Sequence, residues 1–142
     1  MLHDQLATAT PCPCGSSKDY NQCCEAAIEG TSPSATAEQL MRSRYTAFAI
    51  GMSDYLFNST HPDYRQELTI DLLDQYIHET TWTGLEIIDT EQGAEKDQQG
   101  TVTFVASFNN ADNKAELHEK SRFIRENEHW YYLDGDTQVI EK

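Results

Sequence analysis

All four cysteines of the chain fall within thirteen consecutive residues, and this clustering constrains the fold more than any other feature of the sequence. A Cys-x-Cys pair is followed, after eight residues, by two adjacent cysteines: Cys12, Cys14, Cys23 and Cys24. A disulfide framework normally distributes its cysteines to connect distant segments, and the Cys-x-x-Cys spacing of redox dithiols is absent. Four thiolates fill the tetrahedral shell of Zn²⁺, and such a closed shell is structural rather than catalytic. The sequence therefore predicts a zinc knuckle over residues 12–24.

The loop between these cysteines contains residues that favour such a knuckle. Pro11 and Pro13 fix φ, which lowers the entropy cost of presenting two thiolates one residue apart. Gly15 can take the positive φ that reverses the chain, and Ser16 and Ser17 can donate hydrogen bonds to the sulfurs. A zinc site of this kind contributes about 10–16 kcal/mol of folding free energy. The alternative is a redox or metal-buffering role, which requires an exposed and labile site.

Composition indicates a globular chain and excludes two classes of partner. The 142 residues suffice for one domain with one core, and 38% of them are hydrophobic. The formal net charge of −14 is opposite to the positive surface that binds nucleic acid or anionic membranes. No apolar run is long enough to span a bilayer, and residues 1–6 lack the basic and apolar segments of a signal peptide. We therefore expect a cytoplasmic protein with no nucleic-acid or membrane partner.

Hydrophobic spacing after the cysteines first follows a helical period. Thr36 can cap a helix, with Gln39 completing a capping box and Gly51 ending the helix. Apolar residues recur on one face of it, at Met41, Tyr45, Phe48 and Met52. Two further helices are predicted over residues 54–60 and about 69–79.

From Trp82 onward the period changes to two, which is typical of half-buried strands. Strands are predicted over residues 85–88, 101–108, 115–125 and 129–133. Short turns separate the last three, so these strands are expected to be antiparallel neighbours. Helices followed by a strand meander indicate an α+β domain, with the helices covering one face of a curved sheet. Residues 29–34 have the composition of a linker, which divides the chain into a knuckle over 1–28 and an α+β domain over 29–142.

Several sequence motifs resemble known families. Cys12-Pro13-Cys14-Gly15-Ser16, followed by Cys23-Cys24, resembles the SEC-C motif, the zinc-binding tail of the SecA translocation ATPase. Four further segments are similar to the YchJ family: MRSRYTAF at 41–48, WTGLE at 82–86, LHEKSRF at 117–123 and WYYLDG at 130–135. The resemblance implies a SEC-C knuckle joined to a cone-shaped domain of the nuclear transport factor two-like class. Some members of that superfamily are isomerases or dehydratases, and others only bind or assemble, so the fold alone does not decide the function.

The knuckle of the secretion ATPase is rich in lysine and docks on an acidic chaperone. Here residues 15–22 contain only Lys18, offset by Asp19, so the resemblance does not extend to that partner.

The implied cone has a cavity between the long helix and the sheet. Candidate lining residues are Arg42, Tyr45, Trp82, Ser121, Trp130 and Tyr132. Arg42 and Arg44 are two positions apart and point about 200° apart on a helix, so only one of them can face the sheet. An inward arginine would pair with Glu119, either as an anion-binding or acid/base group or as a structural ion pair, and we favour the ion pair.

The sequence contains only weak candidates for catalysis: His118, Glu119 and Arg42. His118 and Glu119 are adjacent on a predicted strand, so their side chains point to opposite faces and cannot line one cavity. Glu119 shares its face with Ser121 and Phe123. No Ser-His-Asp order, phosphate loop or dinucleotide fingerprint is found.

These observations predict a non-enzymatic, zinc-stabilised binding or adaptor protein. Its knuckle would contact a protein partner, and its α+β domain would carry a small ligand or a homodimer interface through the sheet. The alternative is a small cavity-based enzyme of lyase or isomerase type that uses Arg42, Glu119 or His118.

Overall fold

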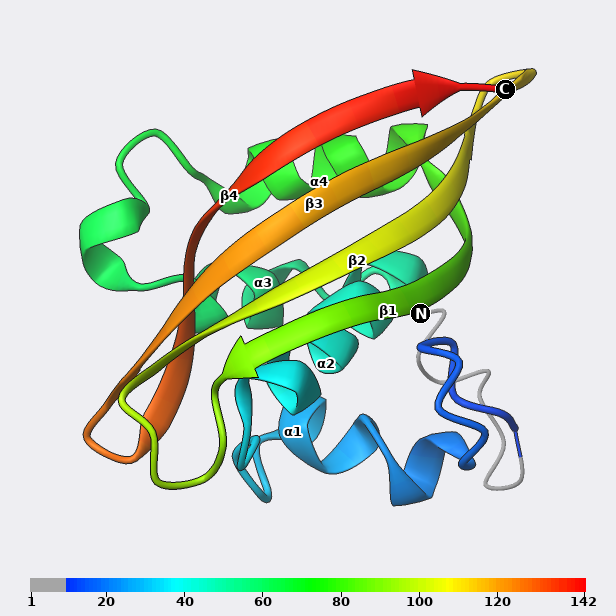
Figure 1. Cartoon of the computed structure of the whole chain (residues 1–142). Helices are drawn as coiled ribbons and strands as arrows, with labels where there is room; N and C mark the ends of the chain where they lie inside the picture. The colour runs from blue at the N-terminus through cyan, green and yellow to red at the C-terminus, as the bar shows by residue number, and fades with distance from the viewer. Residues whose placement is uncertain (1–9) are drawn as a thin grey trace.

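The structure, a computed structural model, describes residues 10–142, so the first nine residues of the predicted 1–28 segment lie outside it. Figure 1 shows a long curved sheet with the helices gathered on one of its faces, as the α+β prediction required. The helical elements are η2 (Tyr20–Gln22), α1 (Glu25–Glu29), α2 (Ala37–Ile50), α3 (Ser53–Ser59), η3 (Pro62–Tyr64) and α4 (Ile70–Glu79). The strands are β1 (Thr81–Gln92), β2 (Gln99–Asn110), β3 (Asn113–Glu126) and β4 (His129–Glu141).

Helix α2 begins and ends where its capping residues predict. Thr36 Oγ1 accepts a hydrogen bond from the Gln39 N–H at 3.1 Å, and Gln39 Oε1 accepts one from the Ala35 N–H at 2.8 Å. Gly51 has a left-handed φ of 87°, and its N–H donates to the Ala47 carbonyl to close the last turn. These local interactions satisfy backbone groups that a helix end leaves unpaired.

The sheet has the order β1-β2-β3-β4 with every neighbouring pair antiparallel, which confirms the predicted meander. β1 and β4 are longer than predicted. Their backbone pairing continues to Gln92↔Gly100 in β1 and to Ala115↔Glu141 in β4. The predicted strands were too short because they followed apolar alternation, whereas ladder hydrogen bonds join backbone groups and extend where side chains are exposed.

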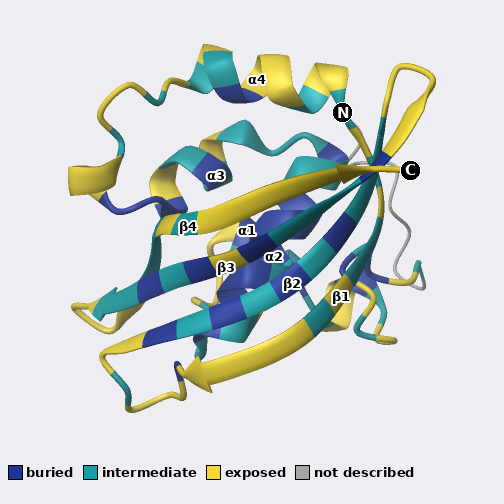
Figure 2. Ribbon diagram, turned by 45° about the horizontal axis from the view of Figure 1, so that its top comes forward, coloured by how far each residue is buried: buried dark blue, intermediate teal, exposed yellow. Residues whose placement is uncertain are grey.

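The core lies between α2 and the concave face of the sheet. Figure 2 shows buried residues along α2, β2 and β3, whereas β4 and most of α4 are exposed. The inward residues of β2 and β3 are Val102, Phe104, Ala106, Glu119, Ser121 and Phe123. His118 points to the opposite face, as predicted from strand alternation, and lies 3.2 Å from Glu116.

The knuckle belongs to the same core. Cys12, Cys14 and Cys24 are buried and pack in one hydrophobic cluster with residues of α2. Gly15 has the predicted positive φ, 77°, and a Cβ there would lie 3.4 Å from the Leu85 carbonyl of β1. Within residues 10–142, no helix combines the length and apolar character needed to cross a membrane.

Candidate metal centre and ligand cavity

The four predicted cysteines converge on one point. Their Sγ atoms all lie within 4.8 Å of one another, with Cys14 and Cys23 at 3.6 Å and Cys23 and Cys24 at 3.8 Å. A tetrahedral zinc with Zn–S bonds of about 2.3 Å places its sulfurs about 3.8 Å apart. The donors present therefore fit a four-thiolate metal site, with Cys12 as the fourth ligand.

Hydrogen bonds between the sulfurs make the pKa values of the cysteines unequal. Hydrogen bonding, first from Cys12 and then from Cys24, lowers the pKa of Cys14 far below its ordinary value. The hydrogen bond to Cys14 raises the pKa of Cys12 to about 11, and hydrogen bonds to Cys12 and Cys14 raise the pKa of Cys24. The cluster therefore stabilises one thiolate and keeps protons on its neighbours, and a divalent cation would displace those protons.

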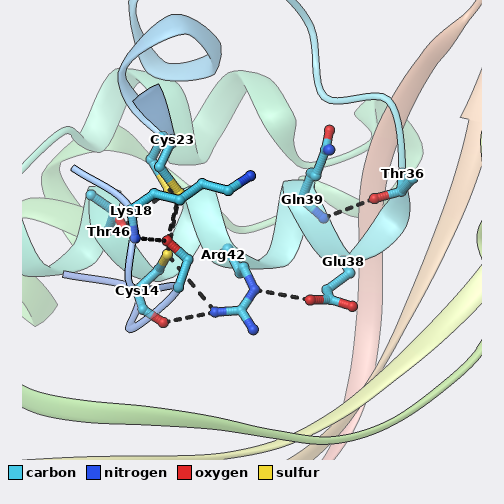
Figure 3. Close-up of polar contacts among 10 residues, drawn as sticks. Cys14, Lys18, Cys23, Thr36, Glu38, Gln39, Arg42 and Thr46 are labelled. Carbon is cyan, nitrogen blue, oxygen red and sulfur yellow. Dashed lines mark hydrogen bonds and ion pairs between the residues drawn. The ribbon is translucent and has the colours of Figure 1, made fainter. Parts of the chain in front are cut away.

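Side chains from α2 surround the cluster, as Figure 3 shows for Arg42 and Thr46. Arg42 Nη1 donates to the Cys14 carbonyl at 2.9 Å and lies 3.9 Å from the Cys14 sulfur, while its Nε donates to Glu38 at 2.9 Å. Thr46 Oγ1 donates to the Cys24 sulfur at 3.3 Å. Groups of this kind orient metal ligands and compensate their charge. The sequence reasoning did not anticipate them, although their spacing of four residues on one helix was a usable signal.

The loop also contributes to this outer layer. Ser16 Oγ lies 3.2 Å from the Cys23 sulfur, which confirms the hydrogen bond predicted for it. Ser17 makes no such bond to a sulfur within the described part of the chain; its backbone has a φ of 75° and its side chain is exposed. The prediction for Ser17 was wrong because the turn directs this side chain to solvent.

A second site is a cavity of about 320 Å³ between the helices and the concave face of the sheet. Most of its wall is apolar or aromatic, from α2, α4 and all four strands. This part of the wall includes Tyr45, Phe48, Trp82, Phe104, Ala106 and Phe123. Polar side chains interrupt it, among them Arg44, Thr60, Glu119, Ser121 and Tyr132. Pockets that bind small molecules have this composition, a largely apolar lining with a few convergent polar groups.

Glu119 is the centre of a hydrogen-bonded group in the cavity. Its Oε2 accepts from Ser121 Oγ at 2.5 Å and from Tyr132 Oη at 3.0 Å. Burial and the Glu119 charge raise the pKa of Tyr132, so its hydroxyl stays protonated and remains a donor. Gly135 on β4 lies beside this carboxylate, where a Cβ would come within 2.9 Å of Glu119 Cγ. A glycine is needed at this position because a larger residue would displace the carboxylate.

Arg44, rather than Arg42, is the arginine that faces inward. Its Nη1 donates to the Leu56 carbonyl at 2.9 Å, to Ser59 Oγ at 2.7 Å and to Thr60 Oγ1 at 3.2 Å. Its guanidinium carbon lies 4.4 Å from the centre of the Tyr132 ring. Burial lowers the pKa of Arg44, an effect that the charge of Glu119 partly opposes.

The predicted ion pair between the inward arginine and Glu119 does not form within the described residues. Arg44 donates hydrogen bonds to the end of α3, and Glu119 accepts hydrogen bonds from Ser121 and Tyr132. The Tyr132 side chain joins the two groups, since its ring covers the guanidinium and its hydroxyl donates to the carboxylate. The sequence could not show this because it does not specify how α2 is rotated against the sheet.

Some of the six predicted pocket residues line the cavity and others lie outside it. Four of them line the cavity: Tyr45, Trp82, Ser121 and Tyr132. Arg42 lies outside it because α2 turns this side chain toward the knuckle. Trp130 also lies outside, since its indole N–H donates to the Ala35 carbonyl at 3.1 Å. Of the three weak catalytic candidates, only Glu119 borders the cavity, because Arg42 and His118 face other surfaces.

Family models match the chain in two segments. Residues 36–135 match the model described as YchJ, middle NTF2-like domain. Residues 10–26 match the SEC-C motif, which contains all four cysteines.

Relatives match over most of the chain. A UPF0225 protein of Photorhabdus laumondii is 43% identical over 126 residues, covering 87% of this chain and 79% of the relative. A UPF0225 protein of Streptomyces coelicolor is 45% identical over 127 residues, covering 89% of this chain and 94% of the relative.

Two solved structures have the same fold. The solution structure of a SEC-C motif containing protein from Rhodopseudomonas palustris has a TM-score of 0.82 and 32% identity, covering 89% of this chain and 98% of that one. The crystal structure of a SEC-C motif containing protein from Psychrobacter arcticus has a TM-score of 0.77 and 28% identity, covering 89% of this chain and 82% of that one.

Proposed function

The chain belongs to the YchJ family of SEC-C motif proteins, and from this premise we propose that it is a binding protein with a structural zinc ion and a small-molecule cavity. The four-thiolate knuckle holds the zinc and braces α2. The α+β domain takes a small ligand between α2 and the concave face of the sheet. The protein performs this role by binding rather than by turnover.

The cavity is the observation that carries this proposal. Its volume of about 320 Å³ lies at the lower end of the range for small-molecule pockets, which indicates a small ligand. Four of the polar groups that interrupt the wall, Arg44, Glu119, Ser121 and Tyr132, sit on helix α2 and strands β3 and β4 rather than on loops. Side chains on such elements keep their positions, so the cavity is ready to bind without rearrangement.

Zinc is the metal that the donor set supports best. Four soft thiolates in tetrahedral spacing select zinc over the hard cations magnesium and calcium. A closed shell leaves no position for a substrate, so the ion would stabilise the knuckle and would not act on the cavity ligand. Metal analysis should find one zinc per chain in the wild type and none in Cys14→Ser.

Filling the cavity tests the binding role. Ala106 is 1% exposed and points into the cavity, so Ala106→Phe places a ring where a ligand would lie. Val105→Phe adds the same ring on the opposite face of β2 and is the matched control. We expect small-molecule hits from a thermal-shift screen of zinc-loaded wild type to bind Val105→Phe and to be lost in Ala106→Phe. The proposal fails if no compound binds the wild type, or if the hits bind both variants equally.

A second candidate, a small lyase or isomerase, is favoured by one observation. Glu119 Oε2 accepts the hydrogen bonds from both Ser121 and Tyr132, so Oε1 can accept a proton from a substrate in this largely apolar cavity. A turnover assay on the ligands found in the screen would distinguish the two functions. Binding without turnover supports the binding role, and turnover that Glu119→Gln abolishes while binding persists supports the enzyme.

A protein partner for the knuckle and a homodimer through the sheet remain predictions from the sequence. Deleting residues 1–28 is not a clean test of the partner, because Cys12, Cys14 and Cys24 are part of the domain core. Lys18→Glu is better, since this side chain is exposed on the knuckle surface. Retention of a purified partner by Lys18→Glu would count against docking through this loop.

A further inference from the structure

One edge of the Arg44 guanidinium has no hydrogen-bond partner among the described residues. Arg44 is only 9% exposed, and its three hydrogen bonds all leave from Nη1. Within residues 10–142, neither Nε nor Nη2 makes a hydrogen bond. In that part of the chain, Ser34 Oγ is the only side-chain nitrogen or oxygen that is both completely buried and without a hydrogen-bond partner. Since Nε and Nη2 of Arg44 also lack a partner, neither atom can be completely buried, and both keep some accessible surface. Arg44 is one of the residues that line the cavity.

The free edge has the geometry of a carboxylate receptor. The N–H bonds of Nε and Nη2 are parallel and match the two oxygens of a carboxylate in a bidentate pair. Leaving a buried guanidinium edge without an acceptor is unfavourable, and a ligand anion would remove that cost. The structure thus provides a donor pair at a largely apolar cavity, with no acceptor for it among residues 10–142.

Arg44 is also held in place before any ligand binds. The three acceptors at the C-terminal end of α3 fix Nη1: Leu56 O, Ser59 Oγ and Thr60 Oγ1. The Tyr132 ring covers the guanidinium at 4.4 Å. A donor that is already oriented loses little entropy when it binds, which favours affinity for the matching anion.

Glu119 restricts the charge that the ligand can carry. Its carboxylate borders the same cavity and is held there by Ser121 and Tyr132. A phosphate, with up to two negative charges, would be repelled more strongly than a carboxylate with one. Beyond these groups the wall is apolar and largely aromatic, with Tyr45, Phe48, Trp82, Phe104 and Phe123.

We propose that the cavity ligand is a small monocarboxylate with an apolar, preferably aromatic, body, and that its carboxylate binds the Nε–Nη2 edge of Arg44. The proposal rests on the proposed function, because it names the class of ligand for the same cavity. The apolar body packs against the aromatic wall, where ring contacts add to the area buried.

Matched probes test the carboxylate directly. Phenylacetate, phenylacetamide and phenyl phosphate share one ring and differ in the polar group. Their Kd values for zinc-loaded protein can be measured by NMR titration of the backbone amides. We expect phenylacetate to bind at least about tenfold more tightly than the amide, as one charge-assisted hydrogen bond would give, and more tightly than the phosphate.

Two variants separate ligand binding from structural damage. Arg44→Lys keeps the charge but lacks the fork, so phenylacetate binding should weaken about tenfold while phenylacetamide binding is unchanged. Glu119→Gln removes the nearby negative charge, so phenylacetate should bind more tightly than to the wild type. A purely structural role for Glu119 would not improve binding. If Arg44→Lys does not fold, the three probes on the wild type and the Glu119→Gln variant still test the carboxylate proposal.

Each outcome has a definite meaning. If phenylacetamide binds as tightly as phenylacetate, or if Glu119→Gln fails to strengthen phenylacetate binding, the carboxylate proposal is overturned and the small-molecule cavity stands. Tighter binding of phenyl phosphate overturns the single-charge argument and with it the ligand class. If none of the probes binds folded, zinc-loaded protein, the ligand class is overturned, and absence of any hit in the wider screen overturns the proposed function as well.

Discussion

Gly135→Ala should destabilise the domain because the new Cβ would collide with the Glu119 side chain. A Cβ at Gly135 would meet the Glu119 side chain at 2.9 Å from Cγ and 2.8 Å from Cδ, and it would also press on Oε2. Glu119 cannot move without giving up its hydrogen bonds from Ser121 and Tyr132. Gly84 on β1 is the matched control, because a Cβ there has no atom within 4 Å.

The cost follows from those two bonds. Hydrogen bonds to a charged group contribute about 1.5–3 kcal/mol each, so losing both would cost about 3–6 kcal/mol. Glu119 borders the cavity, where water can replace part of the loss, so we expect about 2–4 kcal/mol. For a chain of this length that corresponds to a fall in Tm of roughly 7–13 °C. Gly84→Ala should stay within about 0.5 kcal/mol of the wild type.

Equilibrium unfolding in urea with saturating zinc measures these values. The decisive comparison is a double-mutant cycle, in which Gly135→Ala is introduced into a Glu119→Ala background. With the carboxylate gone, the cost of Gly135→Ala should fall to that of Gly84→Ala. If Gly135→Ala costs as much stability in the Glu119→Ala background as in the wild type, the strain lies in the β4 backbone and a collision with Glu119 is not its cause.

Three further predictions concern the metal site and the outer face of the sheet. With free zinc held at a thousand times its Kd, chelation of the metal or Cys14→Ser should lower the free energy of unfolding by about 4 kcal/mol, which is smaller than the full binding free energy because it depends on the zinc concentration. Denaturant titration with and without zinc measures this loss, and an unaltered midpoint would contradict the prediction. Arg42→Gln should weaken zinc binding about tenfold, measured by competition with a chromogenic chelator, because it removes the positive group beside Cys14; unchanged affinity would contradict that role. Arg122→Gln removes ion pairs to Asp134 and Asp136. Because these pairs lie on an exposed surface, the substitution should change neither the zinc affinity nor the unfolding midpoint. A clear loss of stability would show that the ion pairs stabilise the fold.

Local chemistry made much of the fold predictable. Thr36 and Gly51 marked the ends of α2 because capping depends on residues a few positions apart. The side-chain alternation of β3 placed Glu119 and His118 on opposite faces, since strand geometry has a period of two. Strand lengths were underestimated, because the backbone pairing that extends β4 depends on its neighbour and not on its own side chains.

The candidate sites were predictable to different degrees. The cysteines could be identified as candidate metal ligands because they are close in sequence, and a short loop leaves few ways to arrange them. The pocket residues come from α2, α4 and all four strands, and their convergence depends on register. Ser121 pairs with Gly135 across the β3–β4 ladder, and that pairing brings Tyr132 to the Glu119 carboxylate.

The cysteine cluster, the ends of α2 and the order of helices before strands could be read from the sequence, because each depends on residues close together in the chain. The arginine that faces the cavity could not be chosen in this way, because that choice depends on tertiary packing. Arg42 and Arg44 project from opposite sides of α2, and helical periodicity does not say which side meets the sheet. That choice is made by the packing of α2 between the knuckle and the sheet, which sends Arg42 to the metal cluster and leaves Arg44 facing the ligand cavity.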